Sequence, residues 1–236
     1  MASFQQSQNL LLAELPSVDF ELLRPYLRTI DMPRGLTLVR SGETAETAYF
    51  PHSGVISSIV TLADGDTIEV RMTGRDGALG ATPGAAERTW FASAVVRIEG
   101  TSSVIDLPDL QAAIDRSTDL RAALARGEAV QQAIAEQSIA CNAAHDVAAR
   151  MARRLMRLCE TSGETKFVVT QEALAEMLGI RPNAVSLVAH AMSEAGIIRY
   201  RRGLVEILDV DALHDQSCEC YDTVMAYQRA SGAHSH

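Results

Sequence analysis

The chain has 236 residues, of which 47% are hydrophobic and 22% charged. This composition is typical of folded globular proteins and excludes a disordered or collagen-like chain, and the length predicts one domain or two. The formal net charge of −9 argues against a protein that coats nucleic acid through overall basicity. Residues 1–9 show no secretory pattern and no apolar run is long enough to span a membrane, so we expect a cytoplasmic protein without a membrane partner.

Apolar side chains at helical spacing predict a short helix over residues 18–30. After Pro33 and Gly35 the pattern changes to short β-type runs separated by glycine-rich turns. These runs cover residues 36–40, 48–50, 54–62, 67–73, 93–99 and 102–107. Such a series indicates a β-sandwich or barrel. Residues 74–86 hold four glycines and a proline, and we expect them to form an irregular loop within the series.

Strand signals stop at Leu107. Residues 108–116 predict a short helix, and Ser117 or Thr118 can cap a much longer helix that runs to about Ala144. One stripe of this helix alternates steps of four and three, the spacing of a coiled-coil seam. Its members are Leu120, Leu124, Gly127, Gln131, Ile134, Ser138 and Cys141. The stripe either contacts a second copy of the chain, which we favour, or covers the chain's own β-domain. Its polar members Gln131 and Ser138 are candidates to reach a ligand.

Two arginine clusters interrupt an otherwise acidic chain. Asp146 can cap a helix that runs through Cys159, with Val147, Met151, Leu155 and Leu158 on one face. Arg150, Arg153, Arg154 and Arg157 fall on its other faces, and Arg199, Arg201 and Arg202 lie within four residues farther on. Local clusters of this kind indicate an anion-binding face that the whole-chain charge conceals.

Residues 168–208 have the pattern of a winged helix-turn-helix. Thr170 can cap a first helix, Gly179 permits a tight turn, and Pro182 suits the first turn of a second helix. The expected buried positions are Ala173, Leu174 and Leu178 in the first helix and Val185, Val188 and Met192 in the second. After Gly196 an alternating stretch predicts a hairpin with Arg201, Arg202 and Gly203 at its tip.

A helix-turn-helix places the start of its second helix in the DNA major groove. Arg181 and Asn183 are the candidates for reading bases, because Arg pairs bidentately with guanine and Asn with adenine. Ser186 and His190 are adaptable hydrogen-bonding groups on the same helix. The alternative is that Arg181 and Asn183 serve only as solvated turn residues.

The winged helix-turn-helix, the long helix and the β-domain together resemble the Crp/Fnr family of bacterial transcription regulators over residues 10–221. T-Q-E-A-L-A-E-M-L-G carries most of the resemblance, and R-G-L-T-L-V-R-S-G-E, A-Y-F-P-H-S-G-V-I-S and D-G-A-L-G match the β-domain. The resemblance implies an α+β chain. Its parts would be a cyclic-nucleotide-binding-like double-stranded β-helix (jelly-roll) sensor domain over 1–116, a dimerisation helix over 117–145, a winged helix-turn-helix over 146–215 and a C-terminal tail over 216–236.

The resemblance also implies a homodimer on a roughly palindromic operator in double-stranded DNA, with RNA polymerase as a further candidate partner. The residues expected at the DNA interface are Thr170, Gln171, Arg181, Asn183, Ser186, His190, Arg199, Arg201 and Arg202. Many family members have Arg-Glu-x-x-Ser-Arg in the second helix, where this chain keeps only Ser186. The operator sequence of those members therefore does not carry over.

The sensor site departs from the family pattern for cyclic AMP. Members that bind it have a Glu within the G-E-L-G turn and an Arg-Ser pair farther on, whereas this chain has Ala78 in the turn and Ala92-Ser93 at the pair. A charged nucleotide would be buried without partners, so we expect no response to cyclic AMP. The effector, an unknown small molecule or redox signal, would meet a candidate pocket of Gly77, Ala78, Leu79, Gly80, Arg88, Gln131 and Ser138.

The four cysteines, Cys141, Cys159, Cys218 and Cys220, are too few for a disulfide framework. None lies near the N-terminus, where iron–sulfur sensors of the family carry their cluster. Cys218 and Cys220 form a Cys-x-Cys pair, but only His214 is close in sequence and tetrahedral zinc needs four ligands. We therefore expect structural cysteines, no metal and no cofactor.

The sequence contains none of the common catalytic motifs, so we expect no catalytic residues and no enzyme. The alternative function is a ligand-binding or architectural DNA-binding protein without a regulatory switch.

Overall fold

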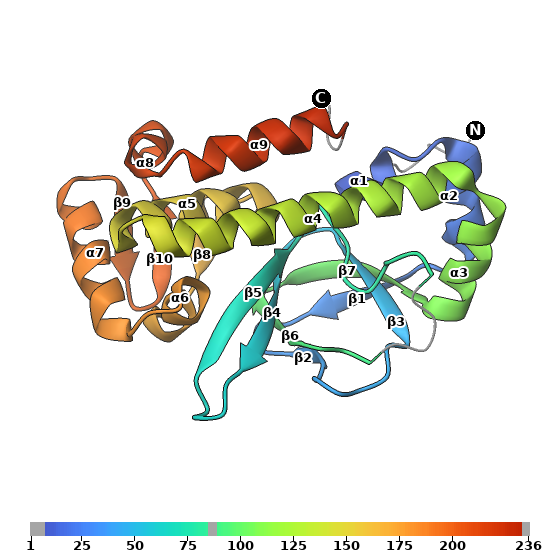
Figure 1. Cartoon of the computed structure of the whole chain (residues 1–236), viewed down its shortest axis with the longest axis horizontal. Coiled ribbons are helices and arrows are strands. Elements are labelled where there is room, and N and C mark those ends of the chain that lie inside the picture. Colours follow the sequence, from blue (N-terminus) through green and yellow to red (C-terminus); the bar gives the residue numbers. More distant parts are fainter. Residues whose placement is uncertain (1–7, 85–88, 233–236) are drawn as a thin grey trace.

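The computed structural model describes residues 8–84 and 89–232. A β-domain and a C-terminal helical part are joined by one long helix, α4 (Thr118–Ala144), which runs along both (Figure 1). The predicted α+β fold class is confirmed. Among the described helices, none is both long and apolar enough to cross a membrane.

The β-domain begins with α1 (Leu10–Ala13), α2 (Ser17–Leu23) and a 3-10 turn, η1 (Arg24–Tyr26). Its strands are β1 (Arg28–Met32), β2 (Thr37–Val39), β3 (Thr47–Pro51), β4 (Val55–Thr61), β5 (Thr67–Thr73), β6 (Ser93–Ile98) and β7 (Gly100–Asp106). They form two antiparallel sheets with strand orders β1-β7-β3 and β2-β6-β4-β5. Side chains of both sheets meet in a core of Met32, Val39, Ile56, Leu79, Ala94 and Val96.

The six predicted strand runs are confirmed, and the prediction of one helix over residues 18–30 was wrong in its second half. Helix α2 ends at Leu23, and residues 28–32 form β1, which pairs along its whole length with β7. Pro25 removes a backbone N–H that a continuing helix would need. Pairing with a distant strand then outweighs the local apolar spacing.

Helices α3 (Leu107–Arg116) and α4 form as predicted. The Ser117 side chain caps α4 by accepting a hydrogen bond from Leu120 N in the first turn at 2.9 Å. The predicted dimer seam, however, faces the chain itself. Leu120 and Leu124 lie in the β-domain core, and Gln131, Ser138 and Cys141 are also buried within the single chain. The preferred interpretation was therefore wrong, because the β-domain and the C-terminal part together cover most of that side of α4.

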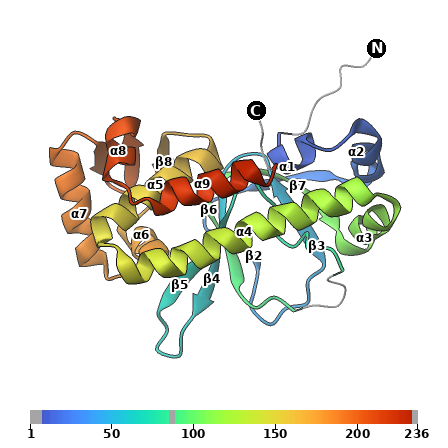
Figure 2. The same cartoon turned by 45° about the horizontal axis from the view of Figure 1, so that its top comes forward.

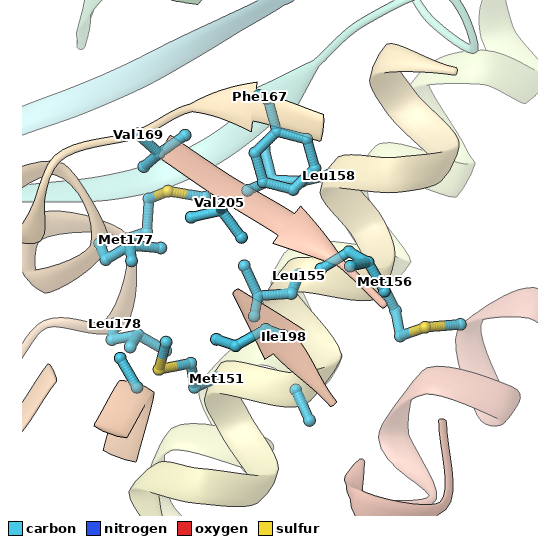
Figure 3. Close-up of a cluster of buried hydrophobic side chains, with 14 of the residues drawn as sticks. Met151, Leu155, Met156, Leu158, Phe167, Val169, Met177, Leu178, Ile198 and Val205 are labelled. Carbon is cyan, nitrogen blue, oxygen red and sulfur yellow. The ribbon is translucent and has the colours of Figure 1, made fainter. Parts of the chain in front are cut away.

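The C-terminal part contains α5 (Val147–Ser162), β8 (Lys166–Val168), α6 (Gln171–Leu178), α7 (Pro182–Glu194), β9 (Ile198–Arg201) and β10 (Leu204–Ile207), followed by α8 (Val210–Gln216) and α9 (Cys220–Ala230). Met151, Leu155 and Leu158 of α5 pack against the β8-β10-β9 sheet and α6 (Figure 3). The sequence pattern indicated neither β8 nor α9. Helix α9 packs along α4, as Figure 2 shows.

The arginines of α5 do not form an exposed anion-binding face, and that prediction was wrong. Arg153, Arg154 and Arg157 are only 2%, 7% and 4% exposed. Arg154 lies 3.4 Å from Glu69 of β5, and Arg157 lies 2.8 Å from Asp76 of the following loop. Arg150 donates to the carbonyl oxygen of Leu178. Arg154 and Arg157 thus hold the C-terminal part against the β-domain.

Candidate nucleic-acid interface

The turn between α6 and α7 is fixed by local chemistry. The Thr170 hydroxyl accepts a hydrogen bond from Ala173 N at 3.2 Å, which caps α6 as predicted. Gly179 ends α6 with φ +61°, a left-handed conformation that glycine adopts without strain. Pro182 occupies the first turn of α7, and Val185 and Met192 bury the inner face of that helix.

The start of α7 is exposed to solvent. Arg181 at its N-cap position and Asn183 in its first turn both have exposed side chains. Ser186 is half-buried and its hydroxyl donates to Pro182 O at 3.3 Å. His190 is exposed and lies 3.4 Å from Glu194. A row of polar groups therefore lies along the outer side of the helix.

Leu187 belongs to the same outer face, although it is not among the interface residues expected from the sequence. Its position four residues after Asn183 places it on the same side of α7, and it is 74% exposed. An exposed apolar side chain here suits contact with the methyl group of thymine. The helical period alone identifies Leu187 as an interface residue, once apolar side chains are counted among possible base contacts.

The wing lies beside the start of α6. Strands β9 and β10 pair in register from Leu204↔Arg201 to Ile207↔Ile198, and Arg202 and Gly203 form the tip with φ values of +51° and +76°. A shallow cavity of about 350 Å³ brings Thr170 and Gln171 together with Arg202. Arg201 is also exposed, whereas Arg199 is neutralised by Glu206 at 2.6 Å. Arg201 and Arg202 are therefore better placed than Arg199 to bind phosphate.

The β-domain also contacts this region, which the sequence did not indicate. Glu176 of α6 accepts hydrogen bonds from Thr67 of β5 at 2.8 Å and from Arg97 of β6 at 2.6 Å. A groove of about 590 Å³ runs between the start of β5 and the α6–α7 turn, and both Asp66 and Arg181 line it. The hairpin of β4 and β5 thus contributes a carboxylate to the groove that a predicted base-reading arginine also lines.

The candidate effector residues lie partly together. Gly77 lies against Gln131, so that a Cβ atom at Gly77 would be 3.2 Å from Gln131 Nε2. Ala78 and Leu79 are buried, and Leu79 exchanges backbone hydrogen bonds with Tyr49. Gly80 packs against Trp90. Ser138 lies away from this turn and accepts a hydrogen bond from Arg153 at 2.9 Å. Arg88 falls outside the described residues.

The cysteines have other neighbours than the sequence suggested. His214, the expected neighbour of Cys218 and Cys220, bonds Asp222 at 3.0 Å instead. The Cys-x-Cys pair meets Cys141 and His145 from the end of α4. The expectation that only His214 accompanies the Cys-x-Cys pair was therefore wrong, because the other two potential ligands come from more than 70 residues away in sequence. Cys159 lies apart, and burial together with the nearby Glu160 raises the pKa of its thiol to about 11.

A family model matches part of the chain, and several solved structures of other proteins are similar to this structure. Residues 149–216 match the model of the Crp-like helix-turn-helix domain. A transcriptional regulator of the CRP family from Thermus thermophilus is 21% identical with a TM-score of 0.67, over 80% of this chain and 96% of the other. FixK2 from Bradyrhizobium japonicum is 15% identical with a TM-score of 0.70, over 81% and 98%. The c-di-GMP responsive global regulator CLP from Xanthomonas campestris is 18% identical with a TM-score of 0.65, over 81% and 99%. No curated protein matches the sequence.

These similarities cover nearly all of each related chain, so the β-domain, the long helix and the C-terminal domain occur together in those proteins as they do here. The family model describes a helix-turn-helix domain, and the structures from Thermus thermophilus and Xanthomonas campestris are described as regulators. The predicted resemblance is confirmed: the chain carries a Crp-like helix-turn-helix domain and has the fold of the Crp/Fnr transcription regulators.

Proposed function

We propose that this chain is a cytoplasmic regulator that binds a roughly palindromic operator as a homodimer and does not respond to cyclic AMP. The observations that carry the proposal are the exposed start of α7, where Arg181 and Asn183 face solvent, and the wing, where Arg202 lies beside the start of α6. Base-reading groups and phosphate-binding groups then lie on adjoining surfaces, as a winged helix-turn-helix requires.

The face of α4 that points away from the chain supports the homodimer. It carries small side chains in steps of three and four, all at least partly exposed, with one charged member among them. These residues are Ala122, Ala125, Ala129, Ala133, Glu136, Ala140 and Ala143, and we call them the alanine stripe. Ile139, at the edge of the stripe, is 72% exposed. Small residues at this spacing let the same helix of a second copy approach closely.

The interior of the β-domain supports the absence of a cyclic AMP response. Buried Leu79 packs with Ile56 and Val96, so apolar side chains line the inside of the turn that would face a nucleotide. Arg71, a cation near this turn, already bonds Glu128 at 3.0 Å and the carbonyl oxygen of Ala78. A phosphate would have to break these bonds and displace apolar atoms, both of which cost free energy.

The test is selection of bound sequences from random DNA with the purified full chain, together with its mass in solution by sedimentation. We expect a short palindrome, a dimer at micromolar concentration, and binding that weakens steeply with salt as phosphates release counterions. Calorimetry with cyclic AMP should show no heat of binding. Protection of DNA without sequence preference would favour the architectural alternative, and a monomer that binds no DNA would contradict the proposal.

The effect on transcription can be measured with the selected operator. A dimer bound upstream of a promoter would act through contact with RNA polymerase, and one bound across it would exclude the polymerase. Run-off transcription from templates with the operator in each position separates these two modes.

A further inference from the structure

Four potential metal ligands meet where the end of α4 contacts the turn between α8 and α9. Cys141 and His145 come from α4 and its C-cap, and Cys218 and Cys220 come from the turn and the start of α9. Their ligand atoms all lie within 4.8 Å of one another. Cys141, Cys218 and Cys220 are 0%, 7% and 2% exposed. These four residues, which we call the cysteine–histidine cluster, are separate from the DNA interface and from the effector region.

The spacing of the cysteine–histidine cluster fits a single tetrahedral ion. Cys141 Sγ and Cys218 Sγ are 3.5 Å apart, and Cys220 Sγ and His145 Nδ1 are also 3.5 Å apart. With bonds of about 2.3 Å to sulfur and 2.0–2.1 Å to nitrogen, the edges of a zinc tetrahedron measure about 3.5–3.8 Å. The observed separations are close to these edges, so one ion can bind all four atoms with small side-chain adjustments.

Neighbouring side chains are arranged as an outer shell for such an ion. Glu219 Oε1 lies 3.2 Å from His145 Nε2, and this contact fixes the ring so that Nδ1 points at Cys220. A carboxylate that accepts the second ring N–H is the usual partner of a metal-binding histidine. Gln137 Nε2 donates to Cys220 Sγ at 3.1 Å, as an amide does toward a thiolate. Both contacts favour the ligand forms that bind a cation.

We propose that Cys141, His145, Cys218 and Cys220 bind one Zn²⁺ ion as a structural site. Three sulfurs and one imidazole nitrogen in a tetrahedron are a ligand set that selects zinc. Four protein ligands leave no open position for a substrate, which is the arrangement of structural rather than catalytic zinc. Each thiol would release its proton as the ion binds.

The site would join α9 to the junction between α4 and α5. The cysteines form a small apolar cluster of their own, with only Ala149 packed against it among the described residues, apart from the large core of the C-terminal part. Leu213 of α8 and Tyr221 of α9 belong to that large core, and α9 packs along α4, but the turn between α8 and α9 adds little apolar burial of its own. A metal ion that links α4 to that turn would strengthen this connection, since metal binding by a folded site stabilises the fold directly.

Metal analysis of the full chain, produced with zinc in the growth medium, tests the proposal. We expect one zinc per chain in the wild type, and loss of that zinc in Cys141→Ser and in Cys220→Ser. Cys159→Ser is the matched control, because Cys159 is a free cysteine outside the cluster, and it should keep one zinc. Zinc retained in both cluster variants, or a wild type that contains none and takes up none, would overturn the proposal.

Cobalt exchange keeps the test independent of variant folding. Wild-type protein stripped with a chelator and supplied with Co²⁺ should show the sulfur-to-metal absorption and the visible bands of a tetrahedral site, and zinc should abolish them. Glu219→Gln should keep the bands but weaken metal affinity about 10- to 100-fold, the usual effect of removing an outer-shell partner. Absence of the bands, or a disulfide between Cys141 and Cys218 in protein purified under reducing conditions, would contradict a metal site.

Discussion

Two residues at the start of α7 are expected to set base preference. Arg181→Ala and Asn183→Ala should each weaken binding to the selected operator by about 1–3 kcal/mol, because each removes a bidentate contact to a base. That loss corresponds to about 5- to 150-fold in Kd. Each variant should also relax preference at one or two positions when the selection is repeated. An unchanged sequence preference in both variants would show that α7 does not enter the groove in this way.

Substitution of a wing arginine should affect DNA binding in a different way from substitution at the start of α7. Arg202→Ala, at the tip beside Thr170 and Gln171, should weaken binding to every sequence alike and reduce the salt slope by about one unit, because a phosphate contact carries no base information. The matched control is Arg34→Ala, which removes an exposed arginine of the β-domain and should change neither quantity. A changed base preference in Arg202→Ala would instead assign base reading to the wing.

Cys159 should be a poor thiol sensor. Burial and the nearby Glu160 raise its pKa to about 11. With that pKa only about one thiol in a thousand is ionised at pH 8, against about one in four for an unperturbed cysteine. Its alkylation rate, followed by mass spectrometry of its peptide, should be low at pH 8 and should rise steeply as the pH approaches 11. Rapid modification at neutral pH would show a reactive thiolate at this position.

At the scale of elements, α4 shows what a heptad pattern can and cannot predict. The helix and its Ser117 cap follow from local chemistry and were predicted within a residue. Its two faces carry the same spacing, one with Leu120, Leu124 and Cys141 and one with the alanine stripe. The coiled-coil spacing favoured the first face as the dimer contact, yet the chain itself covers it. Which face meets which partner depends on long-range packing that spacing does not encode.

A charge introduced into the alanine stripe tests whether this face of α4 forms the dimer contact. Ala129→Glu places a charge at the centre of the stripe, where a second copy would bury it without a partner, so the dimer should dissociate at micromolar concentration. Sedimentation measures the mass. Ala112→Glu is the matched control, because it introduces the same charge on the exposed side of α3 and should leave the mass unchanged. A stable dimer in both variants would exclude this face of α4 from the interface.

Other elements depended on partners far away in sequence. Strand β1 forms because β7 is available to it, and β8 forms because it adds an edge to the wing sheet beside β10. The cysteine–histidine cluster depends on two pairs of ligands separated by more than 70 residues. The helix-turn-helix, by contrast, follows from short-range signals, the Thr170 cap, the Gly179 turn and Pro182, and these could be read directly.

The two parts of the molecule meet through buried charge as well as through a shared apolar core. Arg157 of α5 meets both Asp76 of the β-domain loop, at 2.8 Å, and Glu160, at 3.0 Å, and these carboxylates raise its pKa despite burial. Next to it, Gly74 lies so close to Thr161 that a Cβ atom would be 2.3 Å from that side chain. The clustered arginines of α5 therefore form internal ion pairs and are not used to bind DNA. The sequence pattern alone does not predict this, because the acidic partners lie about 80 residues away.

Breaking this contact should uncouple the two parts. Arg157→Met removes the cation that lies 2.8 Å from buried Asp76 and should destabilise the contact by about 3–5 kcal/mol. Trp90, the only tryptophan, lies in the β-domain, so its fluorescence reports that domain while circular dichroism reports all helices. In urea the two transitions should coincide for the wild type and separate in Arg157→Met. Adding Asp76→Asn should restore part of the loss, because the buried negative charge is then gone. Arg24→Met, which removes an exposed pair with Glu21, should leave both midpoints unchanged. Coincident, unshifted transitions in Arg157→Met would show that apolar packing alone joins the two parts.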